Sequence, residues 1–208
     1  MENRFCVFGD SLSSDEYGCP ISWVSLLKEF LNSGNEDNPM FNLSISGEST
    51  SHLLNRISNE CEARCPSVII IRIGANDARY NDRTEDTVET PIKVFESNVK
   101  KIIEACKKYT DSIVFVGNLP VIESKTTPVF WSDKQHFLNR SIRLYNDTMK
   151  SVCENECVMF IDLFSQWCKM EYGSLMLEDG LHPNQKGHQK LFEDIKDYLI
   201  ENKIIDVI

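Results

Sequence analysis

Several signals of ligand binding are missing from this sequence of 208 residues. It has no GxxxxGK[ST] run for a nucleoside triphosphate and no GxGxxG run for a dinucleotide. Its 22 lysines and arginines face 32 acidic residues, which gives a net charge of −10, and they form no basic cluster that would attract a phosphate backbone. Nucleic acid and anionic membrane surfaces are therefore poor partners for this chain.

Long hydrophobic runs are absent as well. No stretch approaches the roughly 20 apolar residues that a membrane-spanning helix requires. The first residues, MENRFCVF, carry an acid and a base before a strand-like segment, so they lack the apolar core of a secretory signal peptide. These features predict a soluble, cytoplasmic protein with no membrane span.

The eight cysteines allow three interpretations: disulfides, a metal site or buried thiols. Cys61 and Cys65, like Cys153 and Cys157, are four residues apart near the ends of predicted helices, which would place each pair on one helical face. CxxC spacing is absent, however, and no nearby histidine completes a zinc site. We therefore expect small buried side chains, with no metal and no cofactor.

Short apolar runs alternate with helical periodicity along the whole chain. Five runs are typical of strands covered on both faces: RFCVFG, FNLSIS, SVIIIRIG, SIVFVG and VMFIDLF, at residues 4–9, 41–46, 67–74, 112–117 and 158–164. Apolar stripes predict helices over 23–31, 92–106, 138–152 and 191–199. The pattern predicts a single α/β domain over residues 1–208. Its fold would be a three-layer α/β/α, flavodoxin-like one, with a doubly wound five-stranded parallel sheet in the order 2-1-3-4-5.

Polar residues follow the first three predicted strands directly. Ser11 comes after the first strand, Gly47 after the second and Asn76 after the third. Ligands of open α/β sheets bind beyond the carboxyl ends of the strands, where the winding direction reverses. The order 2-1-3 would therefore place Ser11 between Gly47 and Asn76. A glycine N–H and an asparagine amide are suitable donors for the oxyanion that forms when a serine attacks an ester.

A serine nucleophile also needs a base to take its proton. His182 lies in the turn-rich segment EDGLHPN, three residues after Asp179. That spacing lets the carboxylate reach the imidazole Nδ1–H and leaves Nε2 to face the serine. His182 is therefore the predicted base, with Asp179 as its partner.

The other three histidines are weaker candidates for the base. Asp133 and His136 repeat the Asp-x-x-His spacing, but Asp133 is more typical of the first turn of the following helix. His52 is a candidate for the pocket wall. His188 opens the last helix, where we expect it to be solvated.

Four segments of the chain resemble, in order, the sequence blocks of the SGNH hydrolase family, also called GDSL-type esterases and lipases. They are FGDSLS, SISGEST, IGANDAR and EDGLHPN, between residues 8 and 184. The resemblance implies a flavodoxin-like three-layer fold and cofactor-free hydrolysis of ester or thioester bonds. It implies Ser11 as nucleophile and, through its N–H, as oxyanion donor together with the Gly47 N–H and the Asn76 side chain. His182 would act as general acid and base, oriented by Asp179.

Two charged residues near these blocks need an explanation. Asp10 is interpreted either as part of the substrate site, behind Ser11, or as a cap of the turn. Arg72 falls in a strand that should be apolar, so its guanidinium requires a carboxylate partner. We expect that partner to be a helix acid near the strand end, and a role in holding the asparagine block is the alternative.

Together these features favour a serine ester hydrolase that cleaves short-chain acyl esters, acetyl esters of sugars included, through an acyl-enzyme. Two alternatives stay open: a lysophospholipase or thioesterase for longer chains, and a catalytically idle small-molecule-binding module on the same fold. Tyr80, Phe130 and Trp131 lie in the two long connections and either contact substrate or pack their own loops. The sequence makes no prediction about oligomeric state.

Overall fold

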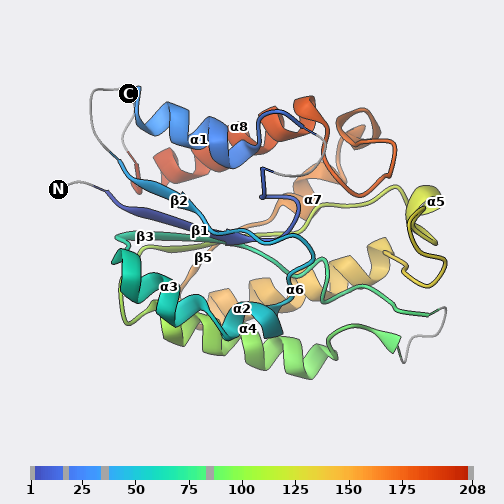
Figure 1. The fold of residues 1–208 in the computed structure, drawn as a ribbon, viewed down its shortest axis with the longest axis horizontal. Helices are drawn as coiled ribbons and strands as arrows, with labels where there is room; N and C mark the ends of the chain where they lie inside the picture. The colour runs from blue at the N-terminus through green and yellow to red at the C-terminus, as the bar shows by residue number, and fades with distance from the viewer. Residues whose placement is uncertain (1–2, 16–18, 34–37, 83–86, 206–208) are drawn as a thin grey trace.

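A computed structural model describes residues 3–15, 19–33, 38–82 and 87–205. At its centre is a five-stranded parallel sheet, which confirms the predicted order β2-β1-β3-β4-β5. The strands are β1 (Phe5–Gly9), β2 (Met40–Asn42), β3 (Val68–Arg72), β4 (Ile113–Val116) and β5 (Met159–Ile161). Helices cover both faces of the sheet, so the α/β fold is a three-layer one (Figure 1).

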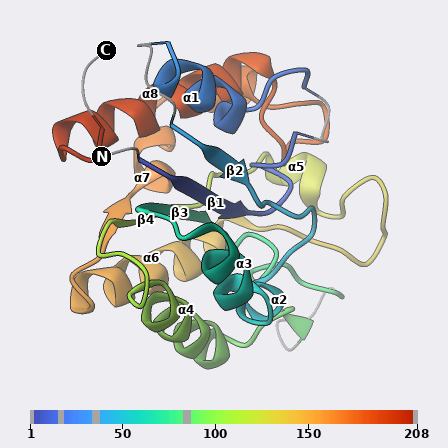
Figure 2. The ribbon, with the colours of Figure 1, turned by 60° about the vertical axis from the view of Figure 1, so that its left-hand side comes forward.

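The helices divide between the two faces of the sheet (Figures 1 and 2). One face carries α1 (Trp23–Leu31) and α8 (Gln185–Glu201). The other carries α2 (Thr50–Leu54), α3 (Ile57–Arg64), α4 (Ile92–Cys106) and α6 (Asn139–Asn155). Shorter helices in the described connections include α5 (Glu123–Thr126), α7 (Leu163–Trp167) and a 3-10 helix (Tyr172–Leu175).

The central strands send alternate side chains into two hydrophobic cores. From β1, Cys6 and Phe8 enter the core beneath α2, α3, α4 and α6, whereas Phe5 and Val7 enter the core beneath α1 and α8. All residues of β1 and β3 are buried, as the near-continuous apolar runs predict. Burial of each such Phe or Ile side chain contributes roughly 1.5–3 kcal/mol to the stability of the folded state. This packing fixes the position of the strand ends that carry the site.

The last strand is shorter than its apolar run suggests. Residues 158–164 predict a strand, but β5 ends at Ile161 and α7 begins at Leu163. The intervening Asp162 caps α7, because its Oδ1 accepts from the Ser165 N–H at 3.2 Å. A side chain able to start a helix therefore overrides the apolar pattern.

The second strand also ends early, at Asn42 instead of residue 46. The chain nevertheless keeps close to β1, because the N–H groups of Leu43 and Ile45 donate to Val7 O at 2.8 Å and Gly9 O at 2.9 Å. These bonds carry the following Ser46 and Gly47 to the end of β1.

The cysteine pairs do not share a helical face, contrary to the prediction. Cys61 and Cys153 are buried, whereas Cys65 and Cys157 are exposed and left-handed, at φ 47° and 55°. A left-handed residue ends a helix and turns its side chain off the helical face. Within the described ranges no group of three or more His, Cys, Asp or Glu side chains is arranged to hold a metal ion.

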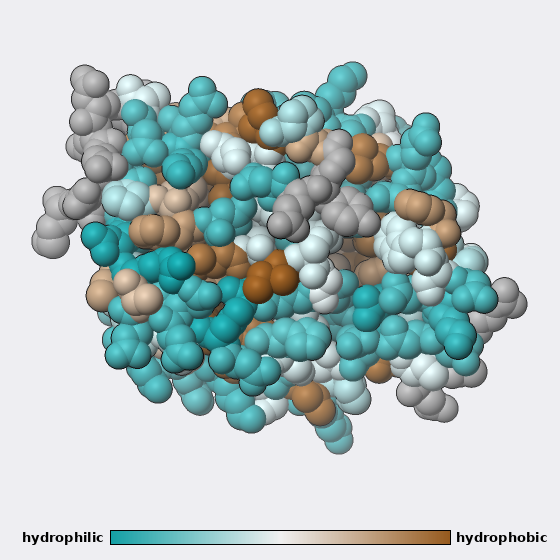
Figure 3. All heavy atoms as spheres, in the orientation of Figure 1, coloured by the Kyte–Doolittle hydropathy of each residue, from teal (hydrophilic) through white to brown (hydrophobic). Residues whose placement is uncertain are grey.

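The face of the molecule seen in Figure 3 is mostly hydrophilic, with hydrophobic side chains between the polar ones. In the described part of the chain, no helix combines the length and the apolar composition that crossing a bilayer requires. The strands are parallel, so their carboxyl ends meet at one edge of the sheet, toward the side where α5 lies (Figure 1). The polar blocks predicted from the sequence follow these strand ends.

Candidate active site

Ser11 lies in a tight turn directly after β1. The N–H groups of Ser13 and Ser14 donate to Asp10 O at 3.0 and 3.1 Å, and the Leu12 N–H donates to Asp10 Oδ1 at 3.0 Å. Gly9 makes this turn possible, because a Cβ there would lie 2.8 Å from the Ser13 side chain. The turn presents the Ser11 hydroxyl beyond the end of the strand.

The Ser11 hydroxyl meets His182 and Asp179 in one hydrogen-bonded series. Ser11 Oγ lies 2.9 Å from His182 Nε2, and His182 Nδ1 lies 2.7 Å from Asp179 Oδ2. The other Asp179 oxygen accepts from the N–H groups of Leu181 at 2.8 Å and His182 at 2.9 Å. Burial alone would raise the pKa of Asp179, but these bonds bring that pKa below its ordinary value. An ionised Asp179 favours a proton on Nδ1, which leaves Nε2 to accept from Ser11.

The turn that carries His182 is fixed by backbone contacts. Gly180 has φ +72°, and a Cβ there would lie 2.8 Å from the Lys125 side chain. The Gly180 carbonyl accepts from the Ile122 N–H at 2.9 Å, and the Leu177 N–H donates to His182 O at 2.7 Å. Glycine is therefore needed for its positive φ and for this close approach.

Gly47 and Asn76 come together at the same pocket as Ser11 and His182, which has a volume of about 130 Å³. Gly47 adopts φ +78°, a conformation that favours glycine. Asn76 Nδ2 donates one hydrogen to Glu48 O at 3.0 Å and keeps a second for another acceptor. The arrangement places potential donors beside the Ser11 hydroxyl.

Two sets of polar contacts, one buried and one partly buried, brace the segment that carries Gly47. Asp77, which follows Asn76, accepts from the Thr50 N–H at 3.0 Å, and burial raises the pKa of Asp77 above its ordinary value. Arg56 forms an ion pair with Glu48 and stacks over the Phe8 ring at 5.5 Å. The second and third blocks are thus tied to each other and to β1.

Of the predicted substrate contacts, one lines the pocket. The Trp131 ring lies 6.2 Å from the His182 ring, and Trp131 Nε1 donates to Gln135 Oε1 at 3.0 Å. Phe130 is 80% exposed and packs edge-on against Trp131 at 4.9 Å, outside the lining. Tyr80 is not a lining residue either; its backbone pairs with His136.

Five further residues line the pocket that the sequence did not single out individually: Ser46, Arg79, Gln135, Phe137 and Leu181. Arg79 is held by Glu89, with Nη2 to Oε2 at 2.8 Å. Gln135 and Phe137 are positioned by the backbone pairing of their neighbour His136 with Tyr80. In this pairing the N–H of each residue donates to the carbonyl of the other at 3.0 Å. A pairing between distant, irregular loops leaves no periodic signal in the sequence.

Three predictions, for His188, Asp133 and His52, need correction. His188 is not solvated: it is 3% exposed, and its Nδ1 accepts from the Trp23 N–H at 3.3 Å. Burial, with the nearby positive charge of Arg72, lowers the pKa of His188 to about 4. Asp133 is not in a first helical turn, because α6 begins only at Asn139. His52 is exposed, bonds to Ser49 and does not line the pocket.

Arg72 and Asp10 are also placed differently from the prediction. Arg72 ends β3, as expected, but its partner is Asp10 and not a helix acid; Nη1 donates to Oδ1 at 3.3 Å. Both residues are 0% exposed. Asp10 therefore lies behind Ser11, where a ligand in the pocket does not reach it.

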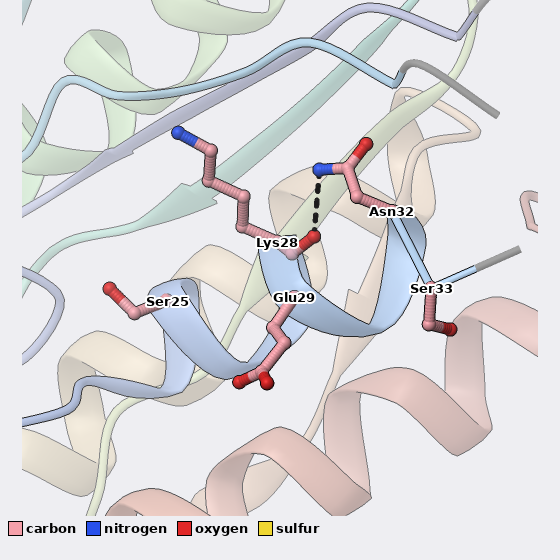
Figure 4. A pocket seen from close by; sticks show the side chains of 5 residues that line it. All are labelled: Ser25, Lys28, Glu29, Asn32 and Ser33. Carbon is pink, nitrogen blue, oxygen red and sulfur yellow. Dashed lines mark hydrogen bonds between the residues drawn. The ribbon is translucent and has the colours of Figure 1, made fainter. Parts of the chain in front are cut away.

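A second hollow lies on the outside of α1 and has a volume of about 520 Å³. Its lining residues are Ser25, Lys28, Glu29, Asn32 and Ser33. Figure 4 shows Lys28 and Glu29 pointing in different directions, and the hydrogen bond drawn runs from Asn32 to the Lys28 carbonyl at 2.9 Å. The described residues that line this larger hollow present no convergent reactive groups, unlike those of the smaller pocket at Ser11.

Comparison with known proteins identifies relatives over nearly the whole chain. The model of the GDSL-like lipase/acylhydrolase family matches residues 7–190. An arylesterase of Vibrio mimicus is 28% identical over 203 residues, covering 96% of this chain and 89% of its own length.

Solved structures share the fold at lower identity. A lipase/acylhydrolase from Enterococcus faecalis has a TM-score of 0.79 at 20% identity over 96% of both chains. An acetylxylan esterase from Geobacillus stearothermophilus has a TM-score of 0.75 at 17% identity, over 94% of this chain and 93% of its own. These two structures thus have the same fold as this chain.

Proposed function

The chain belongs to the GDSL-like lipase/acylhydrolase family, whose esterases hydrolyse carboxylic esters, and from this premise we propose that it cleaves short-chain acyl esters with Ser11 as nucleophile. The observation that carries the proposal is the series Ser11 Oγ, His182 Nε2, His182 Nδ1 and Asp179 Oδ2, joined at 2.9 and 2.7 Å. A hydroxyl, an imidazole and a carboxylate in this order form the arrangement that activates a serine.

In the first half of the reaction, Ser11 Oγ attacks the ester carbonyl carbon while His182 Nε2 takes the hydroxyl proton. The carbonyl oxygen becomes an oxyanion that accepts hydrogen bonds from the Ser11 N–H, the Gly47 N–H and the second hydrogen of Asn76 Nδ2. When the tetrahedral intermediate collapses, the imidazolium gives its proton to the departing alcohol. The product of this half is an acyl group on Ser11.

In the second half, a water molecule attacks the acyl carbonyl and His182 again takes a proton. The same donors stabilise the second oxyanion, and the returned proton restores the Ser11 hydroxyl as the carboxylic acid leaves. Asp179 keeps its negative charge throughout and stabilises the imidazolium. Each step uses side chains and backbone N–H groups of this chain, and none requires a cofactor.

The size of the pocket supports a short acyl group. Its volume of about 130 Å³ is below the roughly 300–1,000 Å³ of pockets that take drug-sized ligands. Trp131, Phe137 and Leu181 supply its apolar part, and Arg79, Gln135 and Ser46 its polar part. The name of one structural neighbour, an acetylxylan esterase, supports acetyl esters among the substrates.

Hydrolysis of p-nitrophenyl esters by the wild type and by Ser11→Ala tests the proposal, together with labelling by a fluorophosphonate. We expect Ser11→Ala to lose both turnover and labelling while the fold persists, and Ser33→Ala, which removes a hydroxyl on the outside of α1, to keep both. Full labelling of Ser11→Ala would refute the assignment of the nucleophile.

An acyl-chain series on the wild type separates the alternatives. We expect the highest kcat/KM with acetate. A rate that rises steadily from acetate to laurate would instead indicate a lysophospholipase or thioesterase. Absence of both labelling and hydrolysis in the wild type would indicate a binding module.

A further inference from the structure

A second pair of charged side chains lies behind Ser11. Arg72 is the last residue of β3, and its backbone register partner on β1 is Gly9, two residues before the nucleophile. The guanidinium Nη1 donates to Asp10 Oδ1 at 3.3 Å, and both residues are 0% exposed. The pair is therefore a buried neighbour of the turn that carries Ser11.

This ion pair gives the folded state little stability. Among the described residues, Arg72 Nε and Nη2 and Asp10 Oδ2 have no hydrogen-bond partner. Burial raises the pKa of Asp10 and lowers the pKa of Arg72, and the attraction between the two charges only partly opposes this. Because buried ion pairs are often no more stabilising than uncharged side chains of similar size, replacing both residues of the pair together would avoid these penalties, whereas replacing one alone would leave an unpaired buried charge.

The pair does, however, hold the backbone around Ser11. Asp10 Oδ1 accepts from Arg72 Nη1 and also from the Leu12 N–H, at 3.0 Å. Leu12 N belongs to the peptide that follows Ser11, and the Ser11 N–H belongs to the peptide that follows Asp10. Fixing the Asp10 carboxylate therefore fixes the peptides on both sides of the nucleophile.

The charges of the pair also reach His182. The charged and titratable groups around the imidazole are Asp179 on its own turn, Asp10 after β1, His188 on α8 and Arg79 on the pocket wall. Arg72 compensates the charge of Asp10, so Asp179 remains the carboxylate whose charge acts on His182 without compensation.

We propose that Arg72 and Asp10 are positioning residues of the hydrolase, which act as one unit on the turn of Ser11. Arg72 orients the Asp10 carboxylate, which in turn orients the Ser11 hydroxyl and N–H, and the pair keeps its net charge near His182 at zero. This inference rests on the proposed function, because it concerns the same nucleophile.

The test uses Asp10→Asn, Arg72→Met, the double variant and the conservative Arg72→Lys. The readouts are kcat and KM for p-nitrophenyl acetate, the labelling rate with a fluorophosphonate, and the midpoint of thermal unfolding. Arg64→Met is the control, since it removes the Arg64–Glu60 ion pair on α3.

We expect each of Asp10→Asn and Arg72→Met to lower kcat by about 100-fold, the size of effect that a misplaced nucleophile produces, with KM changed by less than about threefold. The double variant should lose no more than the worse single variant, because coupled residues are not additive. Arg72→Lys should recover part of the loss, and Arg64→Met should retain wild-type kcat.

The pH dependence of kcat/KM separates positioning from a purely structural role. Asp10→Asn leaves the positive charge of Arg72 uncompensated near His182, which disfavours the imidazolium. The acid limb of the Asp10→Asn profile should therefore move to lower pH. A purely structural role would lower the unfolding midpoint and leave the acid limb in place.

Wild-type kcat in both single variants, or additive losses in the double variant, would overturn the inference even if the variants unfold at lower temperature. The labelling reaction uses no carboxylic ester substrate, so its rate tests the Arg72–Asp10 pair independently of which ester the protein cleaves. Ser11→Ala in the same series tests the proposed function by itself: if it keeps wild-type labelling, that function fails, whatever the Asp10 and Arg72 variants do.

Discussion

Two carboxylates flank Ser11, and each is paired with a nitrogen base, yet their environments differ. Asp179 receives three hydrogen bonds of 2.7 to 2.9 Å, from His182 Nδ1 and two backbone N–H groups. Asp10 receives two, at 3.0 and 3.3 Å, and its Oδ2 has no partner among the described residues. The pKa of Asp179 lies below its ordinary value and the pKa of Asp10 above it.

This comparison shows that burial raises the pKa of a carboxylate unless enough hydrogen bonds oppose it: the counter-charge of Arg72 does not outweigh the complete burial of Asp10, whereas three hydrogen bonds outweigh the burial of Asp179. Arg72 carries a full charge but supplies one long bond. His182 supplies a shorter bond, and the Asp-Gly-x-His turn adds two backbone donors. Asp179 can therefore stabilise the positive charge that forms on His182 during the reaction. Asp10 instead pairs with the permanent positive charge of Arg72.

Removing the imidazole of the Asp179–His182 pair, which accepts the proton of Ser11, should have the largest effect on kcat. We expect His182→Ala to lower kcat by about 10⁴-fold or more, and Ser11→Ala with His182→Ala to lose little beyond the worse single variant, since both act in one step. Single-turnover kinetics with p-nitrophenyl acetate measure this. Losses that multiply in the double variant would contradict a shared step.

The same substitution at both carboxylates sharpens the comparison directly. Asp179→Asn should lower kcat by about 10⁴-fold, because the amide favours the wrong imidazole tautomer. The loss in Asp10→Asn should be about 100-fold, because Asp10 acts through the position of the turn. Steady-state kinetics at one pH compare the kcat values of the two variants. Equal losses would contradict the different roles assigned to Asp179 and Asp10.

The unfolding free energy, unlike kcat, should depend more strongly on the Arg72–Asp10 pair than on the Asp179–His182 pair. Arg72→Met leaves a buried carboxylate without its counter-charge and should cost about 3–5 kcal/mol of unfolding free energy. Adding Asp10→Asn removes the remaining charge, so the double variant should regain most of this loss. Urea denaturation at pH 7.5 measures both, and a double variant no more stable than Arg72→Met would contradict the explanation.

The buried His188 next to Arg72 predicts a smaller, pH-dependent effect. Its folded-state pKa of about 4 lies below the ordinary 6.5, so the unfolded chain binds the proton first as pH falls. Stability should therefore decrease from pH 6.5 toward pH 4, by at most about 3 kcal/mol for this group, and be unaffected by it above pH 6.5. Urea denaturation of the wild type and His188→Gln measures the difference, and parallel pH curves would contradict it.

The sequence was sufficient to predict that Gly47, Asn76 and His182 lie at one pocket with Ser11. The strand order and the residue after each strand end place Ser11, Gly47 and Asn76 together, and the Asp-x-x-His turn is a local pattern. It was insufficient where burial depends on how elements pack. The exposure of His188 is decided by the packing of α8 against α1, and the partner of Arg72 by the end of a neighbouring strand.

Residues 129–136, which supply Trp131 and Gln135 to the pocket wall, and the reactive centre are held by separate sets of backbone contacts. Within residues 129–136 the backbone hydrogen bonds close on the segment itself, as from Val129 N–H to Gln135 O at 3.0 Å, or reach Tyr80. The Asp179–His182 turn is instead anchored at Ile122 and Leu177. Protein engineers can therefore treat residues 129–136 as a replaceable module and retune which esters enter without disturbing the chemistry at Ser11.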